Sequence, residues 1–168
     1  MITLCCSHKI RRRLGLSERP PAPLEPSTRL GNWYLHLVQF GRLQLVLATS
    51  ERSLLTVVLP ARGLRKTIVE NLQVSVGQLL WALGISADAV NRELKAMTPV
   101  TFAAATNRRV ISSMNEFAIH LRADLNGIRD PLALSLRLCD TPMSAVGSKS
   151  RYGIPREVAC ELLMSRGN

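Results

Sequence analysis

The sequence predicts an α+β fold, with an antiparallel sheet of about four or five strands and helices packed mainly on one face of the sheet. Three observations support this prediction. Apolar segments of strand length lie between residues 33 and 59, separated by short polar turns. Longer segments with apolar residues every three to four positions follow them. The chain has 168 residues, so we expect residues 1–168 to form a single domain.

The first part of the chain predicts a short strand, a basic helical turn and an extended connector. Residues 1–6 are mostly apolar, and Ser7 is a suitable N-cap for a helix that ends at Leu14. Prolines then recur through about residues 19–27, which excludes a helix interior or a central strand there. Because the first strand could not fold alone, we interpret this connector as part of the domain.

Three consecutive antiparallel strands are expected next. Apolar residues alternate along residues 33–40, and Gly41-Arg42 is a suitable two-residue hairpin turn. Residues 43–48 and 54–59 are almost continuously apolar, which predicts central strands. Pro60 ends this run, because proline has no N–H to donate to a neighbouring strand.

The second half of the chain predicts helices and one further strand. Helix starts are indicated by Ser86, by Thr106 or Asn107, and by Asp130 followed by proline. We expect helices over residues 64–83, 86–97, 107–126 and 130–138 and from 155 onward, with a short strand over 100–104. In the long helix, the spacing of apolar residues places the following on the buried face: Ile111, Met114, Ala118, Leu121 and Leu125. Asn115 is expected at the edge of that face.

The net charge of +10 suggests a polyanionic partner, either a nucleic acid or an acidic protein. The expected contacts are the basic residues near the two ends of the chain and one aromatic residue: Arg11, Arg12, Arg13, Lys149, Arg151, Arg156 and Tyr34. Aromatic residues are few, which argues against a platform for stacking single-stranded bases. A toxin–antitoxin or mobile-element accessory role fits the size and charge, although no motif indicates it.

An enzyme is the alternative interpretation. Glu51 and Arg52 lie in the turn between two strands, and Asn115 and Glu116 lie on the long helix. If these four side chains met in one cleft, they could serve a small metal-independent hydrolase or nuclease. A triad of Ser112, Glu116 and His120 on the same helix is disfavoured, because the Glu116 carboxylate would stand between the serine and the histidine. We therefore favour a protein without catalytic activity.

Several classes of function lack their signatures in this sequence. The four cysteines have no zinc-ligand spacing, and no phosphate-binding glycine loop or acidic metal cluster is present. We expect reduced, mostly buried thiols and no metal or cofactor. No apolar run approaches the roughly 20 residues of a membrane helix. The charges of the N-terminus follow its apolar residues, the reverse of a secretory signal, so we expect a cytoplasmic protein.

Several segments together resemble a known family. They are a Met-Ile-Thr-Leu-x-Cys start, TRLGNWY at 28–34, QLVL at 44–47 with SERSLL at 50–55, SMNEF at 113–117, and LSLRL at 134–138 before Thr141-Pro. This pattern is similar to that of a bacterial family of uncharacterised proteins, domain of unknown function 6933. The resemblance implies no activity. The family often has aspartate at the positions of Asn32 and Glu116, which favours a structural or binding role for both positions.

Overall fold

The computed structural model describes residues 1–17, 20–146 and 152–165. In these ranges the strands are β1 (Ile2–Cys6), β2 (Trp33–Phe40), β3 (Leu43–Ser50), β4 (Thr56–Pro60) and β5 (Val100–Ala104). The helices are α1 (His8–Leu14), α2 (Leu64–Ala82), α3 (Ala87–Ala96), α4 (Arg108–Asp124), α5 (Pro131–Cys139) and α6 (Pro155–Met164), with a short 3-10 helix η1 (Ser144–Val146). Each strand and helix predicted from the sequence is present, with small shifts at its ends.

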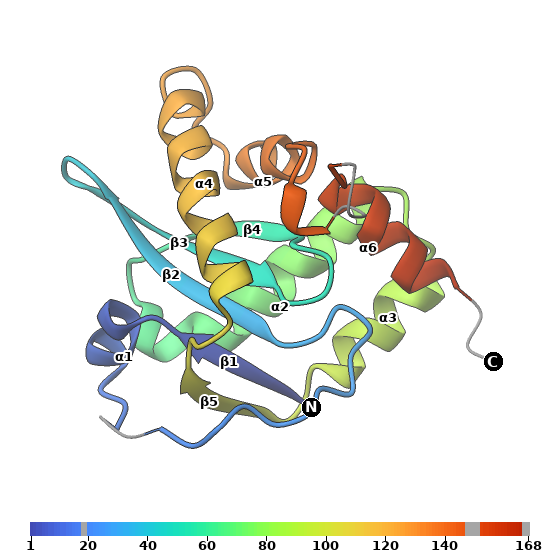
Figure 1. The fold of residues 1–168 in the computed structure, drawn as a ribbon, viewed down its shortest axis with the longest axis horizontal. Coiled ribbons are helices and arrows are strands. Elements are labelled where there is room, and N and C mark those ends of the chain that lie inside the picture. The colour runs from blue at the N-terminus through green and yellow to red at the C-terminus, as the bar shows by residue number, and fades with distance from the viewer. Residues whose placement is uncertain (18–19, 147–151, 166–168) are drawn as a thin grey trace.

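The strands form one mixed sheet in the order β4-β3-β2-β1-β5 (Figure 1). Strands β2, β3 and β4 are antiparallel, as predicted. Strand β1 lies between β2 and β5 and is parallel to both, with Cys5 opposite Tyr34 on one side and Ala103 on the other. The α+β class is therefore confirmed, whereas the prediction of a purely antiparallel sheet is wrong. Which strands pair with β1 is decided by long-range packing, which local sequence patterns do not record.

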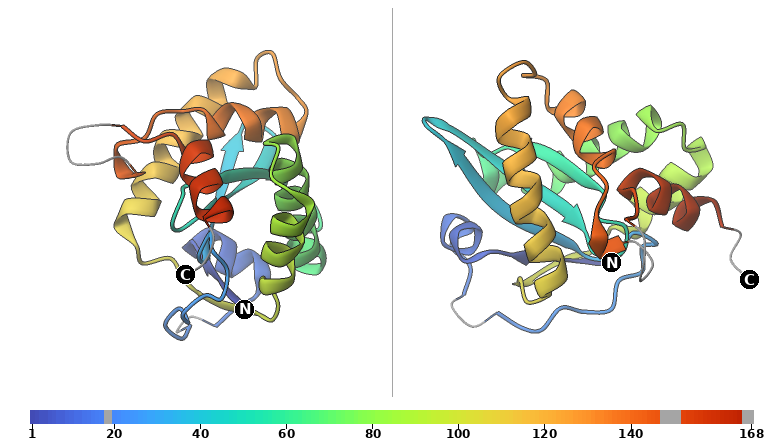
Figure 2. Two further views of the ribbon diagram at one scale, coloured as in Figure 1. Left: turned by 90° about the vertical axis from the view of Figure 1, so that its right-hand side faces the viewer. Right: turned by 45° about the horizontal axis from the view of Figure 1, so that its top comes forward.

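Helices cover both faces of the sheet, and not mainly one face as the sequence suggested. Successive side chains of a strand point to opposite faces. Cys6 and Trp33 accordingly belong to the apolar cluster that includes α2, whereas their neighbours Cys5 and Tyr34 belong to the cluster that includes α4. Figure 2 shows the sheet between α4 on one side and α2 with α3 on the other. The almost continuous apolar runs of β3 and β4 are explained by this two-sided burial.

Strand β4 lies at an edge of the sheet, although its apolar sequence predicted a central position. Helix α5 closes this edge. The outward-pointing N–H of Val58 donates to the Ser135 hydroxyl at 2.9 Å, and the Cys139 thiol lies 3.8 Å from the carbonyl oxygen of Thr56. A side-chain hydroxyl thus replaces a strand neighbour, and the edge is protected from pairing with another chain.

The buried face of α4 is rotated from the predicted one. The residues it buries are Val110, Ser113, Met114, Phe117 and Leu121. Asn115 is exposed to solvent and does not lie at the edge of the core, so its amide needs no internal partner. The predicted N-cap of this helix is correct, because the side chain of Asn107 accepts hydrogen bonds from the N–H groups of Arg109 and Val110.

Candidate functional site

A polar pocket of about 440 Å³ lies at one end of the sheet, beside the N-terminus of α4. The turn after β3 contributes Glu51 and Arg52, and the start of β2 contributes Asn32 and Tyr34. The proline-rich connector and the segment before α4 complete the lining with Pro23, Leu24, Glu25, Pro26, Thr106 and Asn107. The structure therefore brings together Glu51, Arg52 and Tyr34, which the sequence analysis had placed in separate proposals.

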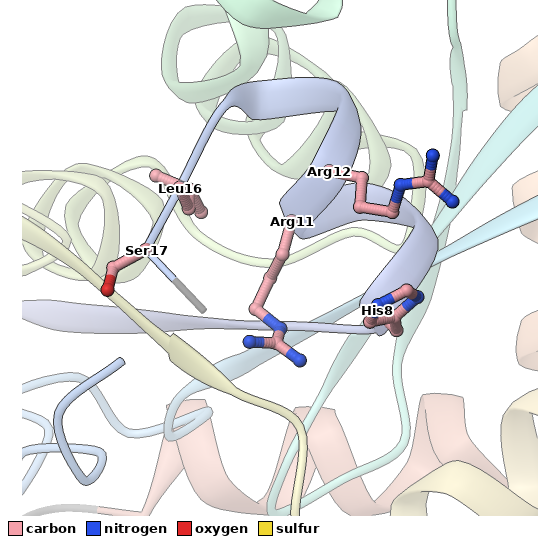
Figure 3. Close-up of a pocket in the computed structure, with 5 residues that line it drawn as sticks. All are labelled: His8, Arg11, Arg12, Leu16 and Ser17. Carbon is pink, nitrogen blue, oxygen red and sulfur yellow. The ribbon is translucent and has the colours of Figure 1, made fainter. Parts of the chain in front are cut away.

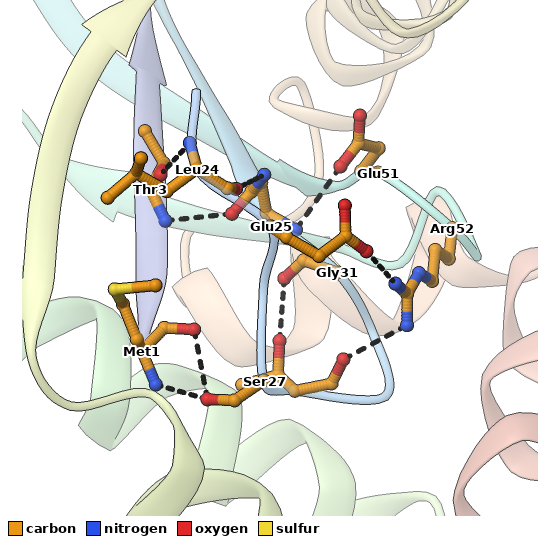
Figure 4. Close-up of polar contacts among 10 residues, drawn as sticks. Met1, Thr3, Leu24, Glu25, Ser27, Gly31, Glu51 and Arg52 are labelled. Atoms are coloured by element: carbon orange, nitrogen blue, oxygen red, sulfur yellow. Dashed lines mark hydrogen bonds and ion pairs between the residues drawn. The ribbon is translucent and has the colours of Figure 1, made fainter. Parts of the chain in front are cut away.

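Asn32 fixes the connector to the sheet. Its Oδ1 accepts a hydrogen bond from the N–H of Thr3 at 2.8 Å, and its Nδ2 donates to the carbonyl oxygen of Leu24 at 3.0 Å. The N–H of Leu24 in turn donates to the Thr3 hydroxyl (Figure 4). Because Asn32 is only 3% exposed and both ends of its amide are used, its role is structural.

The charged residues of the pocket are also tied to neighbours. Arg52 donates to the carbonyl oxygen of Thr28 at 3.2 Å and lies 3.3 Å from the Glu25 carboxylate, as Figure 4 shows. Arg109, from the first turn of α4, donates to the backbone carbonyl oxygen of Glu51 at 3.1 Å. The Arg52–Glu25 pair is solvent-exposed and contributes little to stability, so its main effect is to neutralise the charge of Arg52.

The titratable groups behind the pocket are held in their neutral forms. Burial, together with the nearby Cys5 and Glu51, raises the pKa of Tyr34 above its usual value of 10. Burial also raises the pKa of the Cys5 thiol to about 12, although its hydrogen bond with Tyr34 opposes this shift. Tyr34 is buried, contrary to the expectation of an exposed contact residue. Neither group is activated as a base or nucleophile at neutral pH.

The four residues of the enzyme alternative do not share one pocket. Glu51 and Arg52 line the pocket, whereas Asn115 and Glu116 are exposed on α4 and are not part of its lining. Ser112 and His120 are exposed on the same helix.

Glu93 is an internal carboxylate that the sequence analysis did not single out. It lies on α3, is 3% exposed, and accepts hydrogen bonds at 2.9 Å from the N–H groups of Arg29 and Leu30. Burial raises its pKa, and the two hydrogen bonds oppose that shift. The guanidinium of Arg29 donates to the carbonyl oxygen of Leu162 at the end of α6. The loop before β2 is therefore fastened to both α3 and α6, and Arg29 is part of this bracing.

A second candidate site is basic and lies around α1. A hollow of about 610 Å³ is lined by His8, Arg11, Arg12, Leu16 and Ser17 (Figure 3). In this view Arg11 and Arg12 point in different directions from the helix. Arg12 and Arg13 are exposed, whereas Arg11 is half-buried. Arg11 and Arg12 thus stay together at the hollow, whereas Arg13 reaches away to the Gln44 side chain.

Further basic residues join Arg12 and Arg13 from distant parts of the chain. The guanidinium of Arg13 donates to the Gln44 side chain at 2.6 Å, and the backbone carbonyl of Gln44 accepts from Ala61, next to Arg62. Gly15 follows the end of α1. A Cβ atom placed on it would lie about 3.5 Å from the guanidinium of Arg65. We define the basic face as the exposed residues of this region: Arg12, Arg13, Arg62, Arg65 and Lys66.

The sequence analysis missed Arg62, Arg65 and Lys66. A signal was present, because Arg65 and Lys66 occupy the first turn of α2, which contains no acidic residue. Cations are disfavoured at a helix N-terminus by the helix dipole, but α4 begins in the same way with Arg108 and Arg109, so this placement indicates a site only together with the arginines of α1.

The predicted basic contacts near the C-terminus do not extend the basic face. Arg156 lies on α6, at the opposite end of the molecule from α1, and pairs with Asp140 at 2.9 Å (Figure 1). Lys149 and Arg151 lie outside the described residues.

In residues 1–17, 20–146 and 152–165, no group of three or more His, Cys, Asp or Glu side chains is placed to hold a metal ion. Within the same ranges, no helix has the length and apolar character needed to cross a membrane.

The fold and its sites define an α+β protein with a mixed sheet, a braced polar pocket and a basic face. The chain matches the family model described as Domain of unknown function (DUF6933) over residues 3–158, and it belongs to that family. No curated protein and no solved structure matches it. Two of the segments that resembled this family, residues 28–34 and 50–55, meet at the polar pocket.

Proposed function

We propose that the protein is a non-catalytic binding protein whose basic face contacts the phosphate backbone of a nucleic acid. The observation that carries this proposal is the meeting of two basic segments: Arg65 lies with Lys66 in the first turn of α2, and its guanidinium reaches Gly15 at the end of α1. Both positions are unfavourable for the isolated protein, because the helix dipole and the neighbouring arginines repel further positive charge. The negative charge of a bound polyanion would offset both repulsions.

The residues of the basic face are not among the described arginines that pair with carboxylates. The ion pairs among the described residues join Arg52 to Glu25, Arg137 to Asp124 and Arg156 to Asp140. None of them includes a residue of the basic face. Arginine is also suited to phosphate, because its planar guanidinium can donate two parallel hydrogen bonds.

The arginines of α1 alone would be weaker support for binding of a nucleic acid. Arg11, Arg12 and Arg13 occupy the last turn of α1, where the helix dipole favours cations. Their position can therefore be explained by helix stability. The residues of α2 have no such explanation, and they share the surface with Arg12 and Arg13. This is why the proposal depends on the meeting of the two helices.

The pocket supports the same conclusion by its chemistry. Tyr34 in its lining and Cys5 behind it are held neutral by burial, and Arg52 is paired with a carboxylate. A pocket of this kind can fix a loop or hold a small polar group, but it offers no activated nucleophile. An accessory role in a toxin–antitoxin system or mobile element stays compatible with such a binding protein.

The experiment is a titration of a fluorescent 20-base-pair DNA duplex with the protein between 50 and 200 mM salt. Removing Arg12, Arg65 and Lys66 by substitution with alanine should weaken binding at least about tenfold and reduce the salt slope by roughly two to three. The matched control replaces Arg92, Lys95 and Arg129, three exposed cations away from the basic face, and has the same net charge.

Binding that the control triple variant retains and the basic-face variant loses would support the proposal. Equal losses in the two variants would show that only net charge matters, and absence of binding at 50 mM salt would also overturn it. Duplex RNA, tested in parallel, shows which form of duplex is preferred.

A further inference from the structure

A groove of about 400 Å³ runs along β2 where that strand has no neighbour on one side. Its floor consists of five consecutive residues of β2, from His36 to Phe40. Lys9 of α1 forms one wall, and Ala118, Ile119 and Arg122 of α4 form the other. Consecutive strand residues point to opposite faces, so a groove lined by all five must follow the edge of the strand and not one of its faces.

The edge is open because β1 is shorter than β2. The pairing of these strands ends at Cys6 and Leu35, and the carbonyl oxygen of Leu35 accepts the N–H of Ser7 just before α1 begins. Backbone groups of a strand point to the same side at every second residue. The N–H and C=O groups of Leu37 and Gln39 therefore point into the groove, and no described residue is hydrogen-bonded to them.

The walls of the groove combine apolar surface with positive charge. Ile119 is 71% exposed although it is a large apolar residue, and Val38 and Phe40 of the floor are apolar as well. The ionised residues among the lining are Lys9 and Arg122, and no acidic residue lines the groove. The guanidinium of Arg122 lies over the Phe40 ring at 5.3 Å, which positions it at the end of the groove.

We propose that this groove binds an extended acidic peptide segment of a partner protein, which adds to the sheet as a strand beside β2. The peptide backbone would pair with Leu37 and Gln39, and its apolar side chains would pack on Ile119 and Ala118. Its carboxylates, which alternate with them, would lie on the opposite face beside Lys9, and Arg122 at the end of the groove would add to the positive potential. The charges of the walls select this occupant. A second copy of the chain would bring like charges together across a two-fold axis, which disfavours self-pairing.

This site is separate from the basic face, and its test uses a different ligand. The probe is a capped, fluorescently labelled heptapeptide that alternates valine and glutamate. One control peptide has the same side chains but N-methyl groups on alternate residues, so that it cannot donate backbone hydrogen bonds along one edge. A second control replaces each glutamate with lysine. Only the first peptide is expected to bind, with an affinity that decreases as salt rises.

The central protein variant is Gln39→Pro. Gln39 is exposed and its N–H points away from β3, so proline removes a free donor without removing a hydrogen bond of the sheet. We expect at least about a tenfold loss of peptide affinity, whereas Gln39→Thr should bind as the unaltered protein does. Circular dichroism and the unfolding temperature show whether both variants are folded.

A second pair of variants tests the walls and does not depend on proline. Lys9→Glu combined with Arg122→Glu should weaken binding at least about tenfold, while Arg92→Glu combined with Lys95→Glu, at exposed positions of α3, should not. The proposal is overturned if the N-methylated peptide binds equally well or if neither groove variant differs from its control. It is also overturned if the protein dimerises in sedimentation experiments and Gln39→Pro makes it monomeric, because the edge would then be occupied by a second copy.

Discussion

Charged side chains have different roles in the loop before β2 and on the basic face. In the loop, Glu93 accepts two backbone hydrogen bonds and Arg29 donates to the end of α6, so both side chains are used to hold segments of the chain together. On the basic face, Arg65 and Lys66 are exposed and occupy a helix end that disfavours them. The comparison shows that a charged residue is better assigned by its partners than by its position in a charge cluster.

The comparison predicts that the loop, and not the basic face, determines stability. Glu93→Ala leaves one buried and one half-buried N–H group without acceptors, and we expect it to lower the free energy of unfolding by about 2–4 kcal/mol. Arg12→Ala should change that free energy by no more than about 0.5 kcal/mol. Urea unfolding followed by circular dichroism measures both. Equal effects of the two substitutions would contradict the prediction that the loop determines stability.

A smaller effect is expected from the ionisation of Glu93. Burial raises its pKa in the folded protein, so the folded protein binds more protons than the unfolded chain above about pH 4.5. This contribution to stability is complete below pH 4.5 and is lost as the pH rises through the raised pKa. Glu93→Gln should remove this part of the pH dependence. The free energy of unfolding, measured for both proteins between pH 4 and 8, tests the sign.

The smallest expected change has the opposite direction. Lys66→Glu places a carboxylate in the first turn of α2, where the helix dipole favours it, and should stabilise the protein by about 0.3–1 kcal/mol. The same substitution should weaken binding of duplex DNA. Thermal unfolding and the duplex titration, performed on one preparation, measure the two effects. Lys95→Glu, in the last turn of α3, is the control, and it should not raise the unfolding temperature.

The candidate sites were predicted only in part. Glu51, Arg52 and Tyr34 were identified from the sequence, but their convergence required the register of β1, β2 and β3. The basic face was predicted through Arg12 and Arg13 alone. Its other members come from α2 and from Arg62 just before it, whose distance from α1 cannot be derived from spacing along the chain. Glu93 was missed because its role depends entirely on burial against a loop more than sixty residues away.

The sequence by itself determined the features that depend on neighbouring residues. Strand and helix periodicity, the Asn107 cap and the hairpin after Phe40 are local, because each is set by a few adjacent side chains and by backbone preference. Tertiary structure decided the parallel position of β1, the covering of both sheet faces and the edge position of β4. It also left one side of β2 without a neighbour beyond Leu35, where its pairing with β1 ends. These features arise from burial and pairing between distant segments, whose free energy belongs to the assembled core.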